Sequence, residues 1–223
     1  MLIDSGLNYG NEPSMFFYSA AHYPFSACPC DVNVNSMVVL LRNPILASES
    51  FFRFVVGKSH TKTEFESSQQ FKDLKEKYDQ QWEKANLETW EKQFSHYLSL
   101  PVPILFLKFD EFIMDPQETL FKLFRFLLRR ESLEGTIVNE KIKRYQKKVI
   151  YTPGGSKPVN TQVKLSELQV QNENVIGLLT KFGLMEGSNS DWVNQHNEAV
   201  IKEVSAPGYV QKSYHVKQPE NLQ

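Results

Sequence analysis

Arg42 and Ser50 are the two residues whose types and spacing point most directly to chemistry. The run Val38-Val39-Leu40-Leu41 has the continuous apolar character of a strand buried on both faces of a parallel sheet, and Pro44 is well placed to open the helix that follows. Arg42 would then lie at the carboxyl end of the strand, and Ser50 about two turns into the helix. Ligands bind at that edge of open α/β sheets, so a guanidinium and a hydroxyl there suit an anion, most often a phosphate. The alternative is a buried strand that ends in an ordinary surface arginine.

His22 belongs to the residue type that most readily exchanges a proton near neutral pH. It precedes the predicted strand and lies 20 residues before Arg42. The alternative is an ordinary surface or core histidine, since the chain has five.

An alternating order of elements would position these residues. Strands are expected at 38–41 and 104–109, and Asp115-Pro116 followed by Glu118 is typical of a helix start. The β-α-(α)-β-α order predicts an α/β fold, a doubly wound parallel sheet with helices on both faces. Helices are expected at 45–56, at 69–98 as one helix or as two that meet near Asn86, after Asp115, at 132–149 and at 165–182.

The two strands are expected to be parallel, because a long helical crossover separates them and such crossovers return to the same sheet. One core should then collect large apolar residues from both strands and from the helix after Pro116. These residues are Leu40, Leu41, Ile104, Phe106, Phe121 and Phe124.

The composition indicates one soluble domain. A chain of 223 residues with 41% hydrophobic content suits a single core, which we expect over residues 1–204, followed by a polar, frayed tail at 205–223. The formal charge is −1, so nucleic acid is not expected as a partner. No apolar run is long enough for a transmembrane segment, and the first residues lack the basic region of an export signal.

Cys28 and Cys30 are the only two cysteines, and they are separated by a single proline. A metal site needs more ligands, and a disulfide across one residue would be strained. We therefore expect no metal site, free thiols, and a reducing, cytoplasmic location.

Two segments resemble the sulfotransferases that use 3′-phosphoadenosine 5′-phosphosulfate. The first is Leu41-Arg42-Asn43-Pro44 with Ser50 at the matching distance, and the second is the strand at 103–112 followed by Asp115-Pro116. In that family the arginine and serine hold the 3′-phosphate of the donor. Ala21-His22-Tyr23-Pro24 is similar to the family's Thr-His-x-Pro segment, whose histidine is the general base. The resemblance covers roughly residues 18–185.

Other segments depart from the family's pattern. The Lys-x-Gly-Thr loop that follows the family's first strand has no counterpart, and Gly57-Lys58-Ser59 follows a predicted helix, which indicates a helix end. Ala20-Ala21 replaces a Lys-Thr pair, and Met185 to Trp192 is similar to a segment that grips the 3′-phosphate but lacks its two basic residues. Asp110-Glu111 reverses the family's Glu-Asp order, and we interpret it as an exposed charge pair at a strand end.

The resemblance implies a P-loop-like α/β fold that is incomplete at the N-terminus, without the first strand and the phosphosulfate loop. It implies transfer of a sulfuryl group from the donor to a hydroxyl or amine of a small molecule, carbohydrate or peptide. His22 would be catalytic, and Arg42 and Ser50 would bind the donor. The missing loop leaves open a catalytically inactive relative that serves as a binding or regulatory module. A kinase is disfavoured because no Gly-rich Lys-Ser/Thr loop follows a strand.

Overall fold

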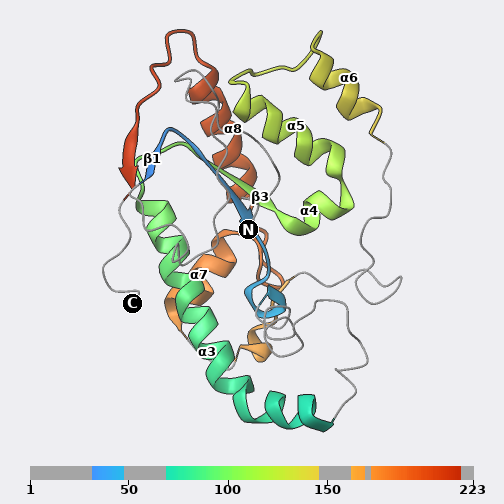
Figure 1. Ribbon diagram of the computed structural model, residues 1–223, viewed down its shortest axis with the longest axis vertical. Helices are drawn as coiled ribbons and strands as arrows, with labels where there is room; N and C mark the ends of the chain where they lie inside the picture. The colour runs from blue at the N-terminus through green and yellow to red at the C-terminus, as the bar shows by residue number, and fades with distance from the viewer. Residues whose placement is uncertain (1–31, 48–68, 146–161, 169–171, 217–223) are drawn as a thin grey trace.

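A small parallel sheet lies at the centre of the fold (Figure 1). The computed structural model describes residues 32–47, 69–145, 162–168 and 172–216. Strands β2 (Met37–Leu41) and β3 (Ile104–Lys108) pair in parallel, with Leu41 opposite Lys108. Both predicted strands and their parallel pairing are therefore confirmed.

A second, antiparallel pair joins the two ends of the described chain. β1 (Val32–Val34) pairs with β4 (Tyr214–Val216). The described part of the C-terminal tail thus ends in a paired strand at 214–216, where the sequence predicted a frayed segment.

Helices account for most of the remaining described residues. The predicted helical segment at 69–98 is one helix and not two, because α3 (Gln69–Ser99) continues through Asn86 without a break. The helix start at Asp115 is confirmed, since its carboxylate accepts a hydrogen bond from the amide of Glu118 at 3.1 Å and Pro116 is the first helical residue. The helices are α3 (Gln69–Ser99), α4 (Phe109–Met114), α5 (Pro116–Leu127), α6 (Ile137–Lys143), η1 (Leu165–Glu167), α7 (Glu173–Lys181) and α8 (Trp192–Ser205).

Two predicted helices are shorter than expected. Within 132–145 only α6 is α-helical, because Gly135 has a φ of 73° and the hydroxyl of Thr136 caps a new helix through the amide of Asn139. Within 165–182, η1 comes first, and the side chain of Asn172 then caps the start of α7. The predicted end at 182 agrees with α7, because Phe182 is its C-cap and Gly183 follows with a φ of 67°, the left-handed conformation that glycine adopts readily.

The sheet separates two layers of helices (Figure 1). On one face, alternate residues of both strands pack against α3 and α7, and on the other face Leu105 and Leu107 of β3 pack against α5 and α8. The described elements therefore form an α/β structure with helices on both faces of a parallel pair of strands. The first group contains Val39, Leu41, Ile104, Phe106, Leu87, Phe94, Leu179 and Phe182.

The prediction that the first strand is buried on both faces is wrong for β2. Val38 is 39% exposed and Leu40 is 54% exposed, because α5 and α8 cover the neighbouring strand β3 on that face. The predicted core is wrong in Phe121 and Phe124 as well, which are half-buried on α5 and belong to neither group of core residues. Helix α5 buries a different face, through Thr119, Leu123 and Phe126.

Helix α8 closes the outer edge of β3 with side chains. The backbone N–H of Phe106 donates to Oδ1 of Asn197 at 2.9 Å, and Nδ2 of Asn197 donates to the carbonyl of Phe106 at 2.6 Å. The preceding residue of α8 makes a similar contact, because Nε2 of His196 donates to the carbonyl of Ile104 at 2.9 Å. In a parallel ladder the N–H and C=O of one residue point to the same side, so these contacts occupy the edge that faces away from β2. No further strand can pair at these positions of β3.

Candidate functional site

The turn after β2 presents Arg42 at the carboxyl end of the sheet. Asn43, which is 4% exposed, accepts hydrogen bonds from the amides of Ile45 at 2.9 Å and Leu46 at 3.3 Å. Asn43 is thus the N-cap of the next helix. This helix begins at Pro44, as the sequence predicted, and is described as far as Ala47. The cap and the proline make a sharp strand-to-helix turn that fixes the backbone of Arg42.

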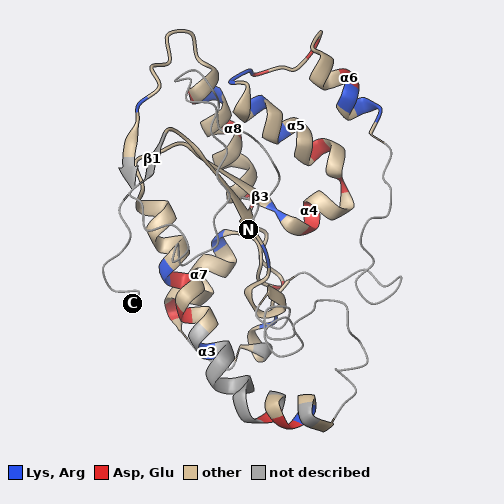
Figure 2. Ribbon diagram, viewed as in Figure 1, with Lys and Arg blue, Asp and Glu red and all other residues tan. Residues whose placement is uncertain are grey.

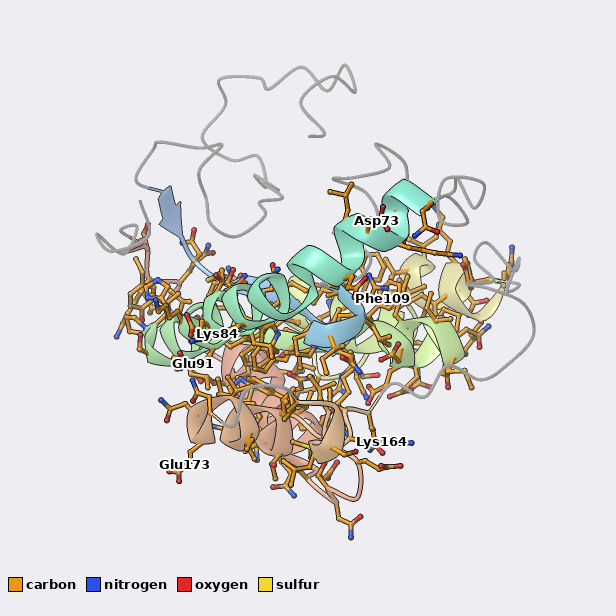
Figure 3. All side chains as sticks on the ribbon, turned by 90° about the horizontal axis from the view of Figure 1, so that it is seen from below. Asp73, Lys84, Glu91, Phe109, Lys164 and Glu173 are labelled. Atoms are coloured by element: carbon orange, nitrogen blue, oxygen red, sulfur yellow. The ribbon has the colours of Figure 1, made fainter. Side chains whose placement is uncertain are left out.

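Arg42 lies against the aromatic ring of Phe109. The central guanidinium carbon is 5.0 Å from the ring centroid and lies over the ring, which is a cation–π geometry. The register explains the contact: Leu41 pairs with Lys108, so the next residue of each strand leaves the same edge side by side. In Figure 3 Phe109 is labelled close to the blue segment that follows β2.

Lys108, the last residue of β3, has a different environment. Its ammonium lies 3.4 Å from a carboxylate oxygen of Glu111, and its side chain is 17% exposed. It also approaches the turn between α7 and α8, since a Cβ at Gly183 would lie 3.2 Å from the ammonium nitrogen. In Figure 2 the end of β3 is coloured as basic, and acidic residues follow on α4. Lys108 is therefore mostly enclosed and paired with Glu111.

Asp110 is half-buried, so it is not the exposed charge that the sequence predicted. Burial raises the pKa of its carboxyl group, and the positive charge of Arg42 opposes that rise. The charge of Glu111 raises the same pKa, whereas that of Lys108 lowers it. A carboxyl with a raised pKa beside a guanidinium marks this edge as a candidate functional site.

Arg42 is the predicted site residue that lies within the described ranges. His22 and Ser50 lie outside them, as do Ala20-Ala21 and Gly57-Lys58-Ser59. Their roles remain predictions. Sequence reasoning missed Phe109, which it assigned to the end of the strand. The signal was present in the two strand ends, because aligning Leu41 with Lys108 would have placed Arg42 beside the aromatic residue.

A cavity of about 500 Å³ lies at the opposite end of β3. It is lined by Ile104 at the start of β3, by Tyr97 near the end of α3, and by His196 and Glu203 of α8. Because β3 runs from Ile104 to Lys108, this cavity is separated from the Arg42 turn by the length of the strand. It is therefore distinct from the candidate site.

Within the described residues, no group of three or more His, Cys, Asp or Glu side chains is arranged to hold a metal ion. None of the helices in the described ranges has the length and apolar character needed to cross a membrane.

The described elements form an α/β fold, and Arg42 lies at the carboxyl end of its parallel strands. The sequence profile of the sulfotransferase domain family matches residues 7–206, which is most of the 223-residue chain. The chain therefore belongs to the sulfotransferase domain family, whose general reaction is sulfuryl transfer and whose usual donor is 3′-phosphoadenosine 5′-phosphosulfate. No curated protein and no solved structure matches the chain.

Proposed function

We propose that this protein transfers a sulfuryl group from 3′-phosphoadenosine 5′-phosphosulfate to a hydroxyl or amine of a small molecule, carbohydrate or peptide. Arg42 and Ser50 hold the 3′-phosphate of the donor, and His22 is the general base. The observation that carries the proposal is the position of Arg42 at the carboxyl end of β2, beside an uncharged ring, in a chain of the sulfotransferase domain family.

At this edge the guanidinium of Arg42 suits a phosphate, whereas the carboxylate of Asp110 does not. The guanidinium of Arg42 can donate two parallel hydrogen bonds to phosphate oxygens. Asn43 stabilises the turn that holds it by capping the helix that follows. The carboxylate of Asp110 opposes an anion by its charge.

The proposed reaction forms one bond and breaks one. The acceptor oxygen or nitrogen bonds to sulfur as the bond between sulfur and the bridging phosphate oxygen breaks. The donor leaves as adenosine 3′,5′-bisphosphate, and the proton of the acceptor passes to His22. Negative charge on the leaving phosphate needs cations or backbone amides close by, which is the part of the site that the Lys-x-Gly-Thr loop supplies in the family.

We also propose the finer organisation that the sequence predicted. The catalytic unit spans residues 1–204, with a tail at 205–223, and its parallel sheet is doubly wound. Such a sheet would continue beyond β2, because Asn197 and His196 occupy the outer edge of β3. Among the described residues no strand pairs with the outer edge of β2. The cytoplasmic location is proposed from the pair Cys28 and Cys30.

A catalytically inactive binding module is the second candidate. Residues 1–223 hold no Lys-x-Gly-Thr sequence, and a site that lacks even one donor of this kind is about a hundredfold slower. Such a module would retain affinity for the bisphosphate without transferring the sulfuryl group.

Calorimetry with adenosine 3′,5′-bisphosphate tests the donor site. Arg42→Ala should weaken binding about tenfold or more, because a hydrogen bond to a charged group contributes roughly 1.5–3 kcal/mol. Arg130→Ala is the matched control, since Arg130 is exposed after the end of α5. Equal affinity in the wild type and in Arg42→Ala would refute the assignment.

A radiolabelled sulfate-transfer assay separates the two candidate functions. The enzyme should sulfate at least one acceptor among phenols, sterols, sugars and peptides, and His22→Ala should abolish transfer while leaving bisphosphate affinity unchanged. Bisphosphate binding without transfer to any acceptor would instead support the binding module.

A further inference from the structure

Phe109 contacts Arg42, and the proposed function assigns it no role. It is the first residue of α4, directly after β3, and its ring lies under the guanidinium of Arg42 with 5.0 Å between the guanidinium carbon and the ring centroid. The pairing of Leu41 with Lys108 brings the two residues together from strands more than sixty positions apart in sequence. The contact is therefore set by the sheet and does not depend on a loop.

A ring in this position holds the guanidinium by its face. The N–H groups of a guanidinium lie in its plane, so stacking on an aromatic face leaves them free to donate to phosphate oxygens at the edge. An arginine side chain also loses rotamer freedom when it binds a ligand. A ring that restrains the side chain in the free protein reduces that loss on binding.

Phe109 is an uncharged neighbour of Arg42, so it does not compete with an anionic ligand for the guanidinium. Asp110 attracts the guanidinium but repels a phosphate at the same place. Glu111 lies 3.4 Å from the ammonium of Lys108, which engages its charge. The uncharged ring attracts the cation through its quadrupole and adds no negative charge that would repel the ligand.

We propose that Phe109 is a positioning residue that holds the guanidinium of Arg42 ready for the 3′-phosphate of the sulfuryl donor. This inference rests on the proposed function, because it assigns Phe109 a role at the same site.

The test is a double-mutant cycle measured by calorimetry with adenosine 3′,5′-bisphosphate. Phe109→Leu keeps an apolar side chain but removes the aromatic face, so we expect binding about two- to fivefold weaker. Phe109→Tyr keeps the face and should bind as the wild type does. In the Arg42→Ala background, Phe109→Leu should cause no further loss, because the ring then has no cation to hold.

The outcomes are distinguishable. Additive losses, or equal weakening by Phe109→Leu and Phe109→Tyr, would overturn the positioning role and indicate a packing role. Weak binding in Arg42→Ala with unchanged binding in Phe109→Leu would overturn this inference and leave the proposed function standing. Equal binding in the wild type and Arg42→Ala would refute the assignment of Arg42 to the donor site in the proposed function.

Thermal unfolding of each variant controls for loss of structure. Should Phe109→Leu unfold at the temperature of the titration, Phe109→Met replaces it, since its flexible side chain fills the volume without an aromatic face. The same cycle applies, and affinity equal to that of the wild type in Phe109→Met would overturn the proposal.

Discussion

Asn197 is the side chain on which the position of β3 depends most directly. It is 2% exposed, and its amide group both accepts from the N–H of Phe106 and donates to the carbonyl of the same residue. Phe106 is 1% exposed, so water cannot replace either hydrogen bond. Asn197→Leu keeps a similar volume while removing both partners of a buried backbone unit.

The cost of this substitution follows from the two unpaired groups. A buried donor or acceptor left without a partner costs about 1–3 kcal/mol, so the pair should cost about 2–6 kcal/mol. A domain has about 5–15 kcal/mol of total stability, and the loss is therefore a large part of it. For a chain of this size the thermal midpoint should fall by roughly 5–20 °C.

Urea unfolding followed by circular dichroism measures this loss. Gln195→Leu is the matched control, because Gln195 is exposed on the same helix and the chemical change is the same. We expect a change within about 0.5 kcal/mol for the control. A free energy of unfolding for Asn197→Leu equal to that of the control would refute the conclusion that α8 closes the edge of β3.

Three further substitutions test the site and its surroundings. Gly183→Ala should destabilise the protein by about 1–2 kcal/mol, because φ there is 67° and a Cβ would lie 3.1 Å from a backbone oxygen. Gly177→Ala should instead stabilise it by up to about 1 kcal/mol, because Gly177 is in mid-helix with open space around it. Shifts of the thermal midpoint in the same direction for both variants would contradict this. Asp110→Asn should raise bisphosphate affinity at pH 7 and leave the thermal midpoint unchanged or higher, because it removes a charge that burial penalises beside Arg42. A fall in both the affinity and the thermal midpoint would show that the carboxylate supports the site. Burial lowers the pKa of His196 below 6.5, so below that pH the unfolded chain binds more protons than the folded protein and the free energy of unfolding falls. His196→Gln should therefore lose stability less steeply than the wild type between pH 6.5 and pH 5. The same dependence of the free energy of unfolding on pH in both proteins, measured by urea unfolding, would contradict the lowered pKa.

The sequence predicted the elements whose signals are local. The strand before Arg42, the strand at 104–108 and the helix start at Asp115 are each marked by a short apolar run or by a cap and a proline. Parallel pairing followed from the length of the crossover between the strands. These features can be predicted without knowing which other elements pack against them.

The features that the sequence did not predict depend on contacts between distant segments. Leu40 has the same apolar character as Leu41, yet it is exposed because helices α5 and α8 cover β3 and not β2 on that face. Asn197 gives no sign in the sequence that it takes the place of a neighbouring strand. Propensity and periodicity describe one element at a time, so they cannot say which edge of a strand another element occupies.

The candidate site has the same dependence on distant contacts. Arg42 was predicted from its place after a strand, but its ring partner Phe109 follows from the register with the other strand. His22 and Ser50 lie outside the described residues, so their positions relative to Arg42 stay predictions.

The closed edge of β3 also constrains where the rest of the site can be. Helix α8 occupies that edge, and Lys108 is engaged by Glu111 and enclosed by the turn at Gly183. Arg42 follows β2, whose outer edge pairs with no described strand. We therefore expect the groups that complete a phosphosulfate site to reach Arg42 from the side of β2, because the side of β3 is already filled.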